Sequence, residues 1–194
     1  MPTGGAEPDW TFATKDPAEQ IPAAVLVALF LPTQAAPPSV VLTRRRTDLR
    51  RHAGEISFPG GRQDPTDTDL RETALREAEE EIGLHRELVS PLGELPPIST
   101  FATNYVIHPF VGLIPPEQAW RASPQEVDAV LELPLREIRA SRTRTEIERR
   151  GFTFEVDAYI LGGHLIWGAT FRILEHLLSE LQAGAFEDAR LAID

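Results

Sequence analysis

Residues 60–84 read GGRQDPTDTDLRETALREAEEEIGL and join a glycine-rich loop to a strongly acidic segment. Asp69 followed three residues later by Glu72 is typical of a capping box at the start of a helix. Gly83 is the usual residue just beyond a helix end, so we expect the helix to run to about Ile82. Three apolar residues form its expected buried stripe: Leu75, Ala78 and Ile82.

Three glutamates of this helix, Glu77, Glu80 and Glu81, are spaced at i, i+3 and i+4, which places them on one face. Like charges at this spacing repel each other by a few tenths of a kcal/mol per pair. Hard divalent cations bind carboxylate oxygens and would relieve that repulsion. The alternative is a solvated face lying opposite the apolar stripe, where any surface helix carries charge.

The loop before the helix ends a short strand with Phe58-Pro59-Gly60-Gly61. Two consecutive glycines let the backbone approach a neighbouring element without a side chain in between. We therefore expect this loop to lie close to the acidic helix, where the carbonyl of Gly61 could add a further metal ligand.

From Arg76 onward the chain resembles the signature of the Nudix family, G-x5-E-x7-R-E-U-x-E-E-x-G-U, in which U is a bulky apolar residue. Arg76-Glu77 match the R-E pair and Glu80-Glu81 the E-E pair. The resemblance implies an α/β fold, the Nudix α/β/α sandwich with a mixed β-sheet. It also implies a pyrophosphate hydrolase whose glutamates bind Mg²⁺ or Mn²⁺ and whose arginine orients the loop and the helix.

The chain departs from this signature in the loop. Gly61 lies fifteen residues before Arg76 instead of fourteen, and no glutamate occupies the early position. Counting from Gly61 leads to Asp67, whereas counting back from Arg76 leads to Thr68. A one-residue insertion explains both counts, with either Asp67 or Asp69 as the loop partner of Arg76.

Residues 41–61, VLTRRRTDLRRHAGEISFPGG, carry a second resemblance, to the motif L-L-T-x-R-[SA]-x3-R-x3-G-x3-F-P-G-G of the coenzyme A-hydrolysing branch. Six positions are in register: Leu42, Thr43, Arg45, Arg50, Gly54 and Phe58. Val41 and Arg46 depart from the motif. A guanidinium group can bind two phosphate oxygens at once through two N–H groups, so we predict that Arg45 and Arg50 bind the substrate. A solvated, salt-bridged loop is the alternative.

The two resemblances imply hydrolysis of the coenzyme A diphosphate to 3′-phosphoadenosine 5′-phosphate and 4′-phosphopantetheine. The candidate ligands of Mg²⁺ or Mn²⁺ are Glu77, Glu80, Glu81 and the Gly61 carbonyl, and the candidate catalytic carboxylates are Glu80 and Glu126. Three alternatives stay open: a Nudix pyrophosphatase for another nucleoside diphosphate derivative, a non-catalytic nucleotide sensor, and a metal-buffering or interaction protein. Residues 166–170 (IWGAT) resemble a further segment of this branch and are expected to serve as core and helix cap.

Composition limits the other function classes. The chain has 194 residues, no cysteine and a net charge of −11 from 30 acidic and 19 basic residues. Such a surface repels nucleic acids and anionic membranes, so we expect small-molecule partners of the coenzyme A class. The longest apolar run, residues 23–31, is far shorter than the roughly 20 residues of a membrane span. We expect a cytoplasmic protein, and the sequence does not indicate its oligomeric state.

The remaining patterns predict a polar lead over residues 1–20 and a single domain over residues 21–194. Short apolar runs predict strands at 23–31, 39–43, 55–58, 105–114 and 127–133. Gly162-Gly163 between 152–160 and 164–167 predicts a hairpin, and residues 170–183 predict an amphipathic helix. Because strands and helices mix without strict alternation, we expect a mixed sheet between helices.

Overall fold

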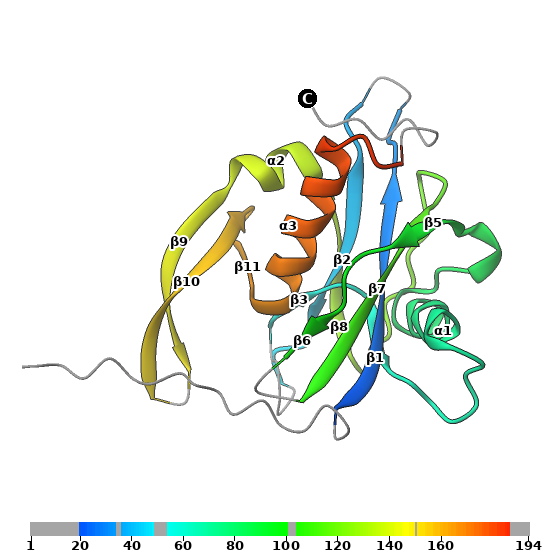
Figure 1. The fold of residues 1–194 in the computed structure, drawn as a ribbon, viewed down its shortest axis with the longest axis horizontal. Helices are drawn as coiled ribbons and strands as arrows, with labels where there is room; N and C mark the ends of the chain where they lie inside the picture. Colours follow the sequence, from blue (N-terminus) through cyan, green and yellow to red (C-terminus); the bar gives the residue numbers. More distant parts are fainter. Residues whose placement is uncertain (1–19, 34–35, 49–53, 101–103, 150, 187–194) are drawn as a thin grey trace, which may run out of the picture.

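The computed structural model describes residues 20–33, 36–48, 54–100, 104–149 and 151–186 (Figure 1). Its elements, in chain order, are β1 (Ile21–Phe30), β2 (Ser39–Arg45), β3 (Ile56–Ser57), β4 (Gly60–Arg62), α1 (Leu70–Ile82), the 3-10 turn η2 (Arg86–Leu88), β5 (Ser90–Glu94), β6 (Ile98–Ser99), β7 (Tyr105–Leu113), β8 (Val127–Pro134), α2 (Leu135–Ala140), β9 (Arg142–Arg149), β10 (Phe152–Leu161), β11 (His164–Trp167) and α3 (Gly168–Gln182). Every strand and helix that the sequence predicts is present, with ends shifted by a few residues at most.

The main sheet runs in the order β3-β2-β1-β7-β5, with β4 paired to β1, β6 to β7 and β8 to β2. β1 and β7 are parallel, whereas the other pairs are antiparallel. The expected mixed sheet is therefore confirmed. β1 lies at its centre and is apolar on both faces, which explains its continuous run of apolar residues.

Two helices cover opposite faces of this sheet, α1 on one side and α3 on the other (Figure 1). Side chains alternate between the faces of a strand, and β1 contributes to both cores accordingly. Val27 and Leu29 pack into the core under α3, whereas Leu26 and Ala28 pack into the core under α1. The α/β/α sandwich implied by the sequence is thus confirmed.

The ends of α1 lie where the sequence places them. Asp69 is the N-cap, and its carboxylate accepts a hydrogen bond from the Glu72 backbone N–H at 2.8 Å. Gly83 ends the helix with a φ of 71°, a left-handed conformation that favours glycine. The helix therefore holds the acidic residues in a defined orientation against the sheet.

The buried face of α1 differs from the expected stripe. Ala74, Ala78 and Ile82 are buried, but Leu75 is only partly buried. Glu81 is also buried, with 5% of its surface exposed. The alternative interpretation, a solvated face opposite the stripe, is wrong for Glu81, because this residue lies on the same face of the helix as Ala74 and Ala78.

A second, three-stranded sheet in the order β11-β10-β9 follows the main sheet. Gly162 and Gly163 form the predicted hairpin turn, with φ values of 59° and 79°. β9 was not predicted, because its sequence, RTRTEIER, is mostly charged and lacks an apolar run. Tyr159 of β10 and Ile166 of β11 join this sheet to the core under α3. None of the helices in the described ranges is long and apolar enough to cross a membrane.

Candidate functional site

The glycine loop touches two carboxylates of α1. The Gly60 N–H donates to Glu81 Oε2 at 3.3 Å. A Cβ added to Gly61 would lie 2.5 Å from Glu77 Oε1, and one added to Gly60 would lie 2.3 Å from the Ala24 carbonyl oxygen. Only bare backbone fits in both places, so the two glycines allow the loop to pack directly against the acidic face of the helix.

Arg45, at the end of β2, joins this cluster from the other side. Its Nη1 lies 3.7 Å from Glu81 Oε1, and its Nη2 lies 3.3 Å from Glu126 Oε2. Its Nε is buried and has no hydrogen-bond partner among the described residues. The guanidinium therefore bridges α1 and the segment before β8, and it keeps N–H groups that these two ion pairs do not use.

The pairing between β2 and β8 shifts at a β-bulge between Arg44 and Arg45. Arg44 pairs with Ala129 whereas Arg45 pairs with Val127, so Asp128 is an extra residue on β8. Such a bulge locally changes the direction in which side chains point. Arg44 Nε donates to Asp128 at 2.8 Å, away from the glutamates of α1.

The other arginines of the segment are placed differently. Arg46 forms an ion pair with Asp48 at 2.6 Å. Arg50, the second predicted phosphate ligand, lies outside the described residues. Arg45 is therefore the arginine of this motif that the described structure places at the acidic cluster.

Asp67 is the loop partner of Arg76, which decides between the two candidates that the sequence left open. Arg76 Nε donates to Asp67 Oδ1 at 2.8 Å and Nη2 donates to Oδ2 at 3.1 Å. The Asp67 side chain is 2% exposed and also accepts from the Thr73 hydroxyl and the Asp64 N–H. Asp69 instead caps the helix, so Asp67 binds Arg76 and Asp69 forms the N-cap.

Burial raises the pKa values of two glutamates in this cluster, whereas hydrogen bonding lowers the pKa of Asp67. Burial, reinforced by the negative charges of Glu77 and Glu126, raises the pKa of Glu81 to about 8, while Arg45 and the Gly60 N–H oppose the shift. Burial also raises the pKa of Glu77, against the effect of Arg76. Hydrogen bonds from Arg76 hold the pKa of Asp67 well below its usual range. Strongly shifted carboxylates that face one another are typical of functional sites.

The four candidate carboxylates lie around one region, but they are not equally accessible. Glu80 is 61% exposed and pairs with Arg76 Nη1 at 3.2 Å, and Glu126 is 51% exposed. In the part of the chain that the structure describes, no three acidic or histidine side chains stand in a ready metal-ligand arrangement. Arg45 and Arg76 supply the neutralising charge there instead.

The donor set nevertheless suits a hard divalent cation. Its groups are oxygens, and burial, with a smaller contribution from negative neighbours, raises the pKa values of both Glu77 and Glu81. A cation would favour the ionised form of both carboxylates and relieve the repulsion between them. These observations fit the magnesium or manganese site that the sequence predicts, with the Gly61 carbonyl as a further candidate ligand.

The segment before α3 has a different role from the one expected. Ile166 is fully buried, and the Thr170 hydroxyl donates to the Ile56 carbonyl at 3.0 Å, so the core role is confirmed. Trp167 occupies the N-cap position but makes no side-chain capping bond, so the capping role is wrong. Trp167 instead lines a hollow beside β3, which sequence reasoning missed because the hollow depends on β9.

Comparison with known proteins gives a consistent match. A model of the NUDIX domain matches residues 20–155. A Photorhabdus laumondii protein described as an uncharacterized Nudix hydrolase, NudL, is 40% identical over 158 residues, which are 80% of this chain and 84% of that protein.

Two solved structures share the fold. A NUDIX hydrolase from Alicyclobacillus acidocaldarius superposes with a TM-score of 0.60 at 19% identity, covering 83% of this chain and 92% of that one. The NUDIX domain of Shewanella oneidensis NrtR, solved with ADP ribose, superposes with a TM-score of 0.58 at 18% identity, covering 88% of this chain and 96% of that one.

Proposed function

The chain belongs to the Nudix hydrolase family, whose members act on the pyrophosphate bonds of nucleoside diphosphate derivatives, and on that premise we propose that its substrate is coenzyme A or a derivative. The products would be 3′-phosphoadenosine 5′-phosphate and 4′-phosphopantetheine. The observation that carries the proposal is the position of Arg45, which belongs to the coenzyme A-type motif and contacts Glu81 of the acidic helix.

Nudix hydrolases generally use divalent cations, and we propose that Glu77, Glu80, Glu81 and the Gly61 carbonyl hold Mg²⁺ or Mn²⁺. Such a cation, when bound, lowers the pKa of a water molecule and neutralises charge on the diphosphate. The partly buried Glu77 and the buried Glu81 lie nearest the glycine loop, whereas Glu80 is exposed to solvent. Arg76 and Asp67 position this set by locking the loop to the helix.

The proton of the attacking water needs an acceptor, and Glu126 and Glu80 are the candidates. Both are more than half exposed, and a general base must reach the water in the site. Arg45 holds the Glu126 carboxylate toward the cluster. Glu81 is a poorer candidate because the Gly60 N–H and Arg45 already contact both of its oxygens.

Arginine must overcome the repulsion between an anionic substrate and a protein of net charge −11. Arg45 has five N–H groups, and its two ion pairs leave donors for a phosphate oxygen. We propose that Arg45 binds the diphosphate and that Arg50 binds a phosphate further along the substrate.

Product analysis tests the proposal directly. The protein is incubated with coenzyme A and Mg²⁺ or Mn²⁺ in ¹⁸O-water, and the label shows which phosphorus is attacked. Glu79→Gln is the matched control for Glu77→Gln, because Glu79 lies on the same helix and pairs with Arg86 instead. Faster cleavage of a nucleotide sugar, a dinucleotide or NADH would overturn the coenzyme A assignment. Nucleotide binding without any turnover would indicate a sensor.

We also propose that the protein acts in the cytoplasm on small anionic molecules, because an acidic surface is repelled by anionic lipid. Fractionation of the native source with an antibody tests this location. A predominantly membrane-bound or exported pool would contradict it.

A further inference from the structure

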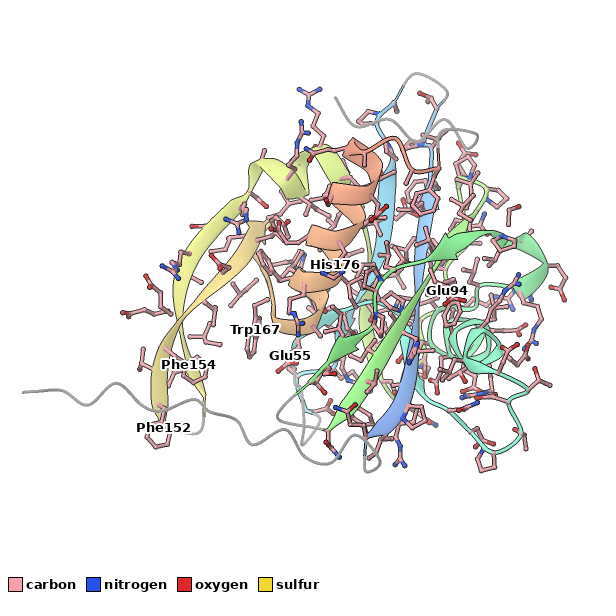
Figure 2. All side chains as sticks on the ribbon, in the orientation of Figure 1. Glu55, Glu94, Phe152, Phe154, Trp167 and His176 are labelled. Atoms are coloured by element: carbon pink, nitrogen blue, oxygen red, sulfur yellow. The ribbon has the colours of Figure 1, made fainter. Side chains whose placement is uncertain are left out.

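A hollow of about 320 Å³ lies between the three-stranded sheet and the start of β3. Its lining comprises Glu55, Glu146, Ile147, Glu148, Leu165 and Trp167. Figure 2 shows Glu55 close to Trp167 where the two sheets meet, with Phe154 further along the hairpin. The volume falls in the range of about 300–1,000 Å³ that is usual for small-molecule sites.

Strand register gives this hollow an apolar floor. Ile147 pairs with Phe154, Leu165 with Ile160, and Trp167 with Ala158. The three β10 partners are separated by even numbers of residues, and paired residues share a face of the sheet. Ile147, Leu165 and Trp167 therefore lie on one face, and β9, β10 and β11 together are needed to assemble it.

The hollow adjoins the reaction centre through β2 and β3. The Arg45 N–H donates to the Glu55 carbonyl at 3.0 Å, so one residue of the lining is hydrogen-bonded to the arginine of the acidic cluster. Neighbouring strands lie about 4.8 Å apart. The backbones of Arg45 and Glu55 are thus one strand spacing apart, a short distance for a substrate with its diphosphate at Arg45 to span.

Charge decides which part of a substrate fits there. Glu55 contributes a carboxylate, which accepts hydrogen bonds from N–H and O–H groups and repels phosphate, whereas the side chains of Glu146 and Glu148 alternate to the face opposite Ile147. An adenine ring could stack on Trp167, but in coenzyme A it would carry the 3′-phosphate toward Glu55. The pantetheine arm has two amide N–H groups, a hydroxyl, methyl groups and no charge.

We propose that this hollow binds the pantetheine arm, and that the Glu55 carboxylate disfavours acyl esters of coenzyme A that end in a negative charge. The inference deepens the proposed function and rests on it for the identity of the substrate. It assigns Trp167 as the apolar contact and Glu55 as the residue that discriminates by charge.

Binding of free pantetheine, which has no phosphate, tests the site without any turnover. The indole N–H signal of Trp167 in the NMR spectrum is assigned by its loss in Trp167→Phe. We expect pantetheine to shift this signal and 3′-phosphoadenosine 5′-phosphate to leave it unchanged at equal concentration. The Trp120 indole, which donates to Glu132, is the internal control. An unshifted Trp167 signal at saturating pantetheine would overturn the proposal.

Steady-state kinetics test the same contacts during hydrolysis. Trp167→Leu should raise KM for coenzyme A by roughly 10-fold, as expected for a lost apolar contact in a pocket. Phe152→Leu is the matched control, because Phe152 is an aromatic residue of the same sheet that is 72% exposed and outside the hollow. Equal KM values in the two variants would contradict the role of Trp167.

Glu55→Gln tests the charge discrimination and also decides the matter if Trp167→Leu fails to fold. The wild type should cleave acetyl-coenzyme A in preference to succinyl-coenzyme A, and Glu55→Gln should reduce that preference several-fold. An unchanged preference would refute the role of Glu55. If pantetheine shifts Trp167 but coenzyme A is not cleaved, the hollow stands and the proposed function fails. If coenzyme A is cleaved but pantetheine leaves the Trp167 signal unshifted, the proposed function stands and the role of the hollow fails.

Discussion

Replacement of Glu81 by glutamine should make the metal-free protein more stable at alkaline pH while abolishing its activity. The Glu81 side chain is 6% exposed, and its burial raises its pKa from 4.5 to about 8. A buried carboxylate that is harder to ionise in the folded state than in the unfolded state costs stability once the pH exceeds its unfolded pKa. Glutamine has nearly the same shape and does not ionise.

The pKa shift sets the size of the effect. A folded-state pKa above the unfolded value means that stability is fully present below about pH 4.5 and is lost as the pH rises to about 8. At about 1.36 kcal/mol per pKa unit, the loss in wild type reaches at most about 5 kcal/mol. Arg45 loses one ion-pair partner in the variant, which offsets about 1 kcal/mol of the gain, although Glu126 still pairs with it.

Urea unfolding in the presence of a chelator measures this prediction. Wild type and Glu81→Gln are compared at about pH 5, 6, 7 and 8.5. We expect similar stabilities near pH 5 and a variant more stable by at least about 2 kcal/mol near pH 8.5. The kcat of the variant with Mg²⁺ should fall at least about 100-fold. Parallel pH profiles for the two proteins would refute the argument that burial of Glu81 destabilises the folded state.

Three further predictions concern neighbouring groups. Glu77→Gln should lower kcat for coenzyme A at least about 100-fold with Mg²⁺, and a wild-type rate would contradict its assignment as a ligand. Asp67→Ala should cost about 3 kcal/mol of unfolding free energy in urea titrations, because it leaves Arg76 without its buried partner. Because the pKa of Asp67 is lowered, its contribution to stability is present above about pH 4 and is lost as the pH falls. An Asp67→Ala variant with an unchanged acid-unfolding midpoint would refute this contribution. Arg45→Ala should lower kcat/KM equally for coenzyme A and dephospho-coenzyme A, whereas Arg50→Ala should affect coenzyme A more; the opposite pattern would exchange their sites.

Local sequence determined the elements that carry the chemistry. Asp69, Glu72 and Gly83 define the ends of the acidic helix through backbone hydrogen bonds and a left-handed terminus, both of which act within a few residues. The apolar runs of β1 and β7 determine the central strands, because only the interior of a sheet buries both faces of a strand. The glycine pair predicted a close approach of backbone, and the contact with Glu77 confirms that approach.

Tertiary structure decided how these elements combine. The choice of Asp67 over Asp69 as partner of Arg76 depends on how the loop folds back over the helix, which residue counting left ambiguous. The burial of Glu81 and its contact with Arg45 join residues 36 positions apart, and they depend on the sheet that packs against α1.

The second sheet is the clearest case of structure that the sequence patterns did not predict. Its strand β9 is charged throughout most of its length and gains its place from pairing with β10, not from local preference. The face formed by Ile147, Leu165 and Trp167 exists only once that pairing sets the register. The ends of the helix and the close approach of the glycine loop could therefore be predicted from the sequence, because they depend on residues close together in the chain. The charges around Glu81 and the hollow depend on contacts between residues that are distant along the chain, and no local pattern predicts such contacts.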